Sequence, residues 1–237
     1  PQQHVGLNFV WNSPIKRREN MNKKLLTTSV YLATSIAMAF EPWIGFDTPT
    51  PYYVNTGLDN GTNTAGYWFV KTDEGDGGKS KVVWPVPAGN EYNPDAIDPI
   101  IDFCKGVCGT ADLDKGTLTY TPFITLGFNV AGEDANSGKL ASGDASEWGG
   151  ICITYRSDIA LYPELSLGDA IDAEIGYALP TRSIPQAKNG TKKCIPWSDF
   201  KQPSWYKGAT KISGPDAAAQ LVSINFKMQN SSGQYKF

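Results

Sequence analysis

The sequence predicts an all-β protein, a β-sandwich of the jelly-roll type, that follows an N-terminal signal peptide. Short runs of β-type residues are separated throughout by Gly, Pro, Asn and Asp, and helical periodicity is confined to two short stretches. The clearest strand, 221–229, has one apolar and one polar face: Val222, Ile224, Phe226 and Met228 against Ser223, Asn225, Lys227 and Gln229. A sandwich buries one face of each such strand against a second sheet.

Residues 21–39 have the pattern of an export signal. Met21-Asn22-Lys23-Lys24 is basic, 25–36 is mostly apolar, and Ala37-Met38-Ala39 is an A-x-A cleavage site. The apolar part is too short to span a bilayer, and the alternative is an ordinary buried helix. We therefore expect residues 1–20 to be an untranslated upstream segment, 21–39 to be the signal peptide, and 40–237 to be one secreted module.

The module is expected to consist of strands joined by loops. The predicted strands are 67–71, 81–84, 118–120, 124–130, 151–156, 164–167, 192–197 and 221–229. A further strand begins at 234, and the sequence stops within it, so we expect the jelly roll to be truncated at its C-terminal strand. Short helices are expected within 94–103 and 216–220.

Charge and histidine content exclude several functions for residues 40–237. This segment carries 16 basic and 23 acidic residues, a net charge of −7, and has no basic patch for nucleic acid. The only histidine, His4, precedes it, which excludes Ser-His-Asp or Cys-His catalysis and His-ligated zinc. No second apolar span exists, so the mature form is not expected to enter a membrane.

The cysteines Cys104, Cys108, Cys152 and Cys194 predict two disulfides in an exported protein. Of the three possible pairings we favour 104 with 108, which closes a small Gly-containing loop, and 152 with 194, which joins two predicted strands. Free buried thiols are the alternative. The spacing does not match the paired C-x2-C knuckles of a zinc site.

Aromatic side chains next to polar ones are the candidate binding residues. Sugar rings pack their C–H faces on Trp and Tyr, and their hydroxyls require Arg, Asp or amide partners. The candidates are Tyr67, Trp68, Trp148, Tyr155, Arg156, Asp158 and Trp205. Core packing is the alternative for each aromatic residue. Trp68 and Phe69 point to opposite faces of one strand, so one of them is expected in the core.

Two acidic groups are weaker candidates. Residues 73–78 offer carboxylates for calcium but fail the EF-hand pattern, and we expect a solvated turn there. A second set could supply the paired carboxylates of a glycosidase, with Asp172 and Glu174 on one face of a strand; its members are Glu164, Asp169, Asp172 and Glu174. No motif singles out a catalytic pair.

Several segments resemble a known family. Ile195-Pro-Trp-Ser-Asp-Phe200, 221–226 and 232–237 resemble the end of galactose-binding-like jelly rolls, most of all the family-eleven carbohydrate-binding modules. Gly45-Phe46-Asp47 is similar to the opening of those modules, and Gly66-Tyr67-Trp68 to their G-Y-W segment. Residues 148–155 resemble the strand that crosses their binding cleft. The insertion at 48–64 and the Cys-containing segment have no counterpart.

The resemblance implies a cleft on a concave sheet that binds single β-glucan chains, with Tyr67, Tyr155, Arg156 and Asp158 in it by position. It also implies structural calcium, for which Asp47 is the candidate, although the second acidic residue of the opening is missing.

The leading hypothesis is a secreted, non-catalytic module that binds plant cell-wall polysaccharide, as a monomer fused to or acting beside a glycoside hydrolase. Alternatives are a surface structural or adhesion protein and a two-carboxylate glycoside hydrolase.

Overall fold

The computed structural model describes residues 8–9, 43–45 and 52–237. The predicted boundaries of the signal peptide and the calcium candidate Asp47 lie outside these residues. Within them, no helix has both the length and the apolar character needed to cross a membrane.

The described chain is built mainly from strands, which confirms the all-β prediction. The strands are β1 (Asn8–Phe9), β2 (Trp68–Thr72), β3 (Lys81–Val83), β4 (Thr110–Leu113), β5 (Phe123–Asn129), β6 (Gly150–Ser157), β7 (Leu161–Ser166), β8 (Ala187–Pro196), β9 (Ser223–Gln229) and β10 (Gly233–Lys236). The helices are α1 (Asp98–Cys104), α2 (Asp169–Glu174) and α3 (Gly214–Ala218), with 3-10 turns η1 (Glu74–Asp76), η2 (Ser146–Trp148) and η3 (Trp197–Asp199).

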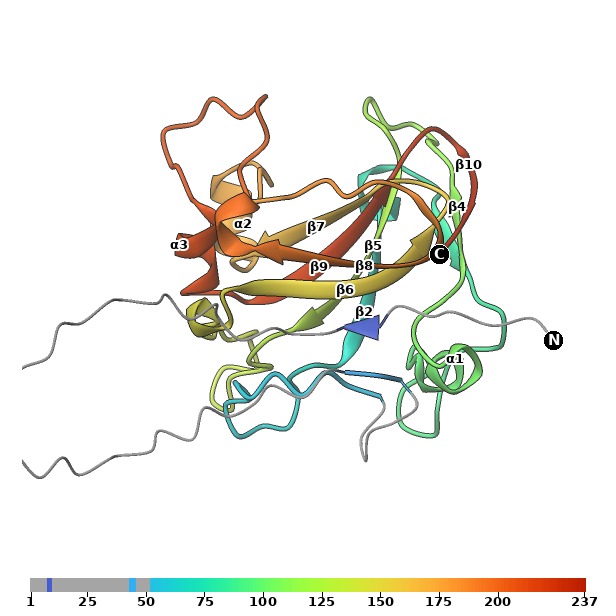
Figure 1. Cartoon of the computed structure of the whole chain (residues 1–237), viewed down its shortest axis with the longest axis horizontal. Coiled ribbons are helices and arrows are strands. Elements are labelled where there is room, and N and C mark those ends of the chain that lie inside the picture. Colours follow the sequence, from blue (N-terminus) through green and yellow to red (C-terminus); the bar gives the residue numbers. More distant parts are fainter. Residues whose placement is uncertain (1–7, 10–42, 46–51) are drawn as a thin grey trace, which may run out of the picture.

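The strands form antiparallel sheets in two layers. One layer is a four-stranded sheet in the order β2-β5-β9-β7, and the other contains the sheets β1-β6-β8 and β10-β4-β3. Figure 1 shows β6 and β8 in front of β7 and β9. The amide of Asp158, just after β6, donates to the carbonyl of Lys236 in β10 at 2.9 Å, which links the two sheets of the second layer.

The core lies between the layers, where the alternation of each strand places its apolar face. On β9, Ile224, Phe226 and Met228 are all at most 1% exposed, as the sequence predicts. Burying each such side chain contributes about 1.5–3 kcal/mol. From β6, Ile153 and Tyr155 pack into the same cluster, so one continuous core joins the two layers.

Both predicted disulfides form. Cys104–Cys108 closes the turn that ends α1, and Cys152–Cys194 joins β6 to β8 at residues that are directly paired in the ladder. A disulfide across an adjacent strand pair fixes the register of that pair.

Two local predictions are wrong, and one strand was not predicted. Residues 118–120 form a turn, while the strand in this region is β4, whose two buried residues Ala111 and Leu113 gave too short an apolar pattern to recognise. Residues 169–174 form α2 and not a strand, because the Asp172 carboxylate accepts from the Leu167 amide at 2.9 Å and holds this turn against the end of β7.

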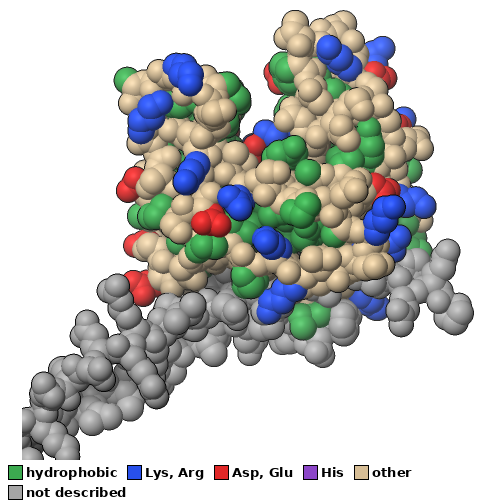
Figure 2. Space-filling model, turned by 45° about the horizontal axis from the view of Figure 1, so that its top comes forward, with side chains coloured by type: hydrophobic (Ala, Val, Ile, Leu, Met, Phe, Trp, Pro, Cys, Tyr) green, Lys and Arg blue, Asp and Glu red, His purple; other side chains and the backbone are tan. Residues whose placement is uncertain are grey.

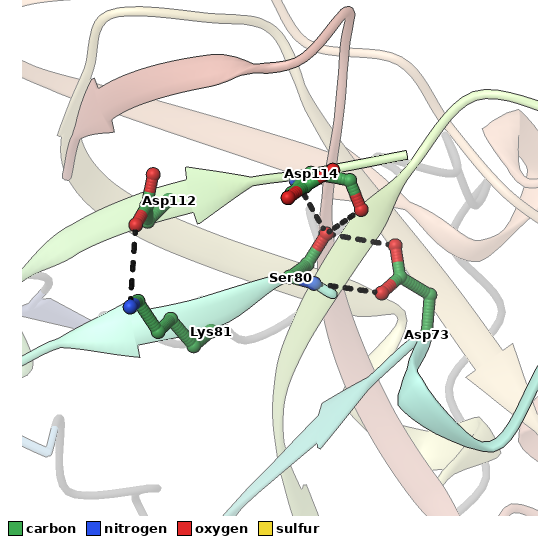
Figure 3. Close-up of polar contacts among 5 residues, drawn as sticks. All are labelled: Asp73, Ser80, Lys81, Asp112 and Asp114. Carbon is green, nitrogen blue, oxygen red and sulfur yellow. Dashed lines mark hydrogen bonds and ion pairs between the residues drawn. The ribbon is translucent and has the colours of Figure 1, made fainter. Parts of the chain in front are cut away.

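The acidic segment 73–78 is a loop closed by its own carboxylate. Asp73 is fully buried, and its oxygens accept from the Ser80 amide at 3.1 Å, the Ser80 hydroxyl at 2.8 Å and the Phe123 amide at 2.8 Å. Figure 3 shows the contacts between Asp73 and Ser80, with Ser80 linked onward to Asp114. Only Glu74, Gly75 and Asp76 face solvent, so the predicted solvated turn is confined to these three residues.

Candidate functional site

The candidate binding residues of β6 and the turn after it differ in exposure. Tyr155 is 1% exposed and its hydroxyl donates to the Pro185 carbonyl at 2.6 Å, so its ring is part of the core and cannot stack on a ligand. Burial raises the pKa of this hydroxyl. Arg156 and Asp158 are exposed on the layer opposite to β2, and the Asp158 carboxylate accepts from the Lys236 amide at 2.9 Å.

The three candidate tryptophans lie in different surroundings. Trp68 is 8% exposed and packs against Trp43 and Phe128 at centroid distances of 5.3 and 5.4 Å, so it is the core member of the Trp68/Phe69 pair. Trp148 is half-buried near Trp197. Trp205 is 62% exposed on the loop 201–213.

Tyr67 borders a pocket at the start of β2. It is 46% exposed and pairs with Tyr53 through an antiparallel bridge, which brings the two rings to 5.1 Å with a tilt of 36°. The adjacent bond from the Val54 amide to the Gly66 carbonyl, 3.0 Å, fixes this pairing. The cavity measures about 470 Å³, and we call it the tyrosine pocket; it is lined by Tyr52, Tyr53, Tyr67, Trp68, Asn90, Tyr92, Asn93, Ala96, Ile97 and Asp98.

The far wall of the tyrosine pocket is a loop organised by Asn90. Its side-chain oxygen accepts from the amides of Tyr92 and Asn93 at 2.9 and 2.8 Å, and its side-chain nitrogen donates to Asp98 at 2.7 Å. On the adjacent side, the Tyr52 hydroxyl contacts both oxygens of Asp102 in α1 at 3.1–3.2 Å. The pocket is therefore preformed by local hydrogen bonds, which lowers the entropic cost of binding.

The polar groups of the pocket retain hydrogen-bonding capacity. Within the described ranges, the hydroxyls of Tyr53 and Tyr67 have no hydrogen-bond partner. The pKa of Tyr67 is raised by burial and by the neighbouring Tyr53 and Asp98, so its hydroxyl remains a donor at neutral pH. Two hydroxyls and one carboxylate thus lie near each other beside aromatic rings.

A second surface of interest is the side of the four-stranded sheet that faces away from the core, which we call the outer face. Cross-strand pairing gives it two rows, Phe69–Gly127–Asn225–Glu164 and Lys71–Thr125–Lys227–Tyr162. A Cβ on Gly127 would lie 2.6 Å from the ring of Phe69, so this glycine allows the ring to lie across the sheet. By alternation, Tyr67 is on the same side of the strand as Phe69.

The carboxylates of the outer face are buried and engaged. Glu164 is 8% exposed and pairs with the Lys227 ammonium at 2.5 Å; burial raises its pKa, and Lys227 partly opposes this. Asp172 accepts from the Ser166 hydroxyl at 2.5 Å, and burial raises its pKa too. Glu174 is turned to the loop 201–213, where it accepts from Thr210 at 3.0 Å. Asp172 and Glu174 therefore do not share a face, contrary to the prediction.

The top of the molecule carries two raised lobes with a hollow between them, as Figure 2 shows. The horizontal positions of the lobes match those of two loops in Figure 1, the orange loop 201–213 and the yellow-green loop 114–122 between β4 and β5.

No group of three or more His, Cys, Asp or Glu side chains suited to a metal ion exists among the residues with described positions. Asp47 is not among them, so structural calcium remains a prediction.

Comparison with known proteins gives distant similarities. No family model matches the chain. It is 22% identical over 176 residues to Endoglucanase 3 of Fibrobacter succinogenes, and the match covers 74% of this chain and 24% of that protein. The chain thus spans about a quarter of the length of this curated relative.

Two solved structures that are similar to the chain are family 11 carbohydrate-binding modules. One is a family 11 carbohydrate-binding module from Clostridium thermocellum in complex with a β-1,3-1,4-mixed-linked tetrasaccharide. Another is the family 11 module of the cellulosomal cellulase Lic26A-Cel5E of that organism. Each is 16% identical with a TM-score of 0.33, covering 75% of this chain and 86% or 85% of the other. At this identity, binding residues do not transfer between chains.

Proposed function

We propose that the chain is a secreted, non-catalytic carbohydrate-binding module that binds plant cell-wall polysaccharide, with β-glucan as the first ligand to test. The observation that carries the proposal is the tyrosine pocket, in which aromatic rings and hydrogen-bonding groups with spare capacity surround a preformed cavity. Phe69, on the same side of β2 as Tyr67, extends this surface along the strand.

The chemistry of the pocket suits a sugar ring. The rings of Tyr53 and Tyr67 offer apolar faces for the C–H side of a pyranose, and aromatic side chains lose little rotamer entropy on binding. Asp98 and the two tyrosine hydroxyls supply the directional partners that sugar hydroxyls require. A site of this kind gives micromolar affinity, roughly −8 kcal/mol.

Binding without catalysis is supported by the state of the carboxylates. A glycosidase needs two carboxyl groups that flank the scissile bond, whereas Glu164 is paired with Lys227 and Asp172 holds the end of β7. Export is supported by the two disulfides, which persist in oxidising compartments. We further propose that the module is a monomer that is attached to a glycoside hydrolase or acts beside one.

Calorimetric titration with mixed-linkage β-glucan, xyloglucan, xylan and cello-oligosaccharides tests the proposal, with each mixture assayed for new reducing ends. We expect saturable binding without new reducing ends. Tyr67→Ala and Tyr53→Ala should each weaken binding about tenfold or more, because each removes one wall of the pocket. Leu140→Ala removes a 45% exposed side chain from a separate loop and should bind like the wild type.

Absence of binding to the whole panel by a folded protein would favour the structural or adhesive function. New reducing ends would show a hydrolase.

A further inference from the structure

The outer face combines aromatic rings with ammonium groups. Among the described residues there are three cation–π pairs, and two of them lie on this face. The ammonium of Lys71 is 5.6 Å from the ring centroid of Phe69, that of Lys227 is 5.5 Å from Phe123, and that of Lys211 is 4.6 Å from Tyr206 in the loop 201–213. A protein with an excess of acidic residues thus places two of its three described cation–π pairs on one face of a sheet.

The two lysines of the sheet lie in one row and are not equivalent. Lys71 and Lys227 are separated by Thr125 on the intervening strand, so their backbones are about 10 Å apart. Lys227 is neutralised by Glu164 at 2.5 Å. Lys71 is exposed, and its ammonium has no hydrogen bond or ion pair within the described part of the chain.

The carboxylates near Lys71 differ in exposure, and the Lys71 ammonium interacts electrostatically with one of them, Asp172. Glu164 and Asp172 are 8% and 6% exposed, and each is held by its own partners within the protein. Asp169 and Glu174 are exposed on α2, and Glu174 is bonded to Thr210. An anion on the outer face would therefore meet a lysine ammonium directly beside an aromatic ring.

We propose that the outer face binds an acidic sugar, a uronate unit within a cell-wall polysaccharide. The pyranose would pack its C–H face on Phe69 while its carboxylate pairs with the Lys71 ammonium. A ring next to an ammonium matches the two surfaces of a uronate at once, whereas a neutral glucose unit leaves the charge unused. This assignment rests on the proposed function, in which the ligand is a glycan.

Matched pairs of ligands test the assignment. Hexagalacturonate is compared with its carboxyl-reduced form, and acidic oligosaccharides of glucuronoxylan are compared with their carboxyl-reduced forms. Calorimetry measures each affinity at low and at high salt. We expect at least one acidic member to bind about tenfold more tightly than its neutral partner, with the difference shrinking as salt is raised. Equal affinities within both pairs would overturn the assignment.

Variants separate a specific contact from general charge. Lys71→Gln should abolish the preference for the acid while leaving the melting temperature and neutral-ligand affinity unchanged, and Lys71→Arg should retain it. Lys192→Gln makes the same charge change at an exposed position of β8 in the other layer and should have no effect. If Lys71→Gln and Lys192→Gln lose the preference for the acidic ligand to the same extent, the assignment of the carboxylate to Lys71 is wrong.

The result also distinguishes this assignment from the proposed function. Binding of neutral β-glucan without preference for acids would overturn only the uronate site, whereas no binding to any glycan would overturn both.

Discussion

Two tyrosines that the sequence offers as sugar-binding candidates have opposite positions in this fold. Tyr67 at the start of β2 is 46% exposed beside a cavity, whereas Tyr155 in β6 is 1% exposed with its hydroxyl bonded to Pro185. Tyr67 lies on the side of its strand opposite to the buried Trp68, so its ring reaches solvent. Tyr155 shares the inward face of a strand paired on both sides. The position of a ring relative to the two layers decides whether it can meet a ligand.

The largest effect on stability is expected for substitutions of Tyr155, the buried tyrosine of this comparison. Tyr155→Ala should lower the free energy of unfolding by about 3–5 kcal/mol, because it leaves a cavity in the shared core. Tyr155→Phe keeps the ring and should cost only about 1 kcal/mol through the lost hydrogen bond. Urea denaturation measures both. A fully stable Tyr155→Ala protein that no longer binds glycan would place the site on β6.

The next largest effect on stability is expected from removal of the Cys152–Cys194 disulfide, which joins β6 to β8. Replacing Cys152 and Cys194 together by alanine should lower the free energy of unfolding by about 2–4 kcal/mol, because the bond closes a loop with a sequence separation of 42 residues. Glycan affinity of the folded variant should be unchanged, since the tyrosine pocket is on the other layer. A loss of affinity in a variant shown to be folded would contradict this separation.

A smaller, pH-dependent effect on stability is expected at Asp172. Burial raises the pKa of Asp172 in the folded protein, so its protonated form is favoured by folding. Its contribution to stability is therefore present below the pKa of the unfolded chain and is lost as pH rises through the higher folded pKa. The wild type should gain stability relative to Asp172→Asn as pH falls from neutral to acidic values. Parallel urea titrations measure the difference, and a constant difference would show that burial does not control this group.

The smallest effect is expected at Arg156. It is exposed on the layer away from the tyrosine pocket, so Arg156→Ala should change stability by no more than about 0.5 kcal/mol and leave glycan affinity unchanged. Titration of this variant beside Tyr67→Ala is the direct comparison. Weaker glycan binding by Arg156→Ala would instead place the binding site on the layer that contains β6.

Much of the fold follows from local patterns in the sequence. The alternation on β9 predicts its buried face, the cysteine spacing predicts both disulfides, and the period of two predicts that Trp68 and Phe69 separate. The burial of Tyr155 was also encoded, because it shares a face with Ile151 and Ile153, both of which are core residues.

The candidate site is harder to predict from local sequence patterns, because it depends on contacts between segments that are distant in the sequence. Tyr53 and Tyr67 meet across a bridge, and the wall at 90–98 closes the cavity through the side chain of Asn90. Helix α2 escaped prediction because it has only six residues and depends on the tertiary bond between Asp172 and the end of β7.

The most direct test of the central claim is a paired calorimetric titration of Tyr67→Ala and Tyr155→Phe with the polysaccharide that the wild type binds. We predict that Tyr67→Ala loses about tenfold or more in affinity while Tyr155→Phe binds like the wild type, with both proteins folded. The reverse result, with binding retained in Tyr67→Ala and lost in Tyr155→Phe, would contradict the assignment of the ligand to the tyrosine pocket.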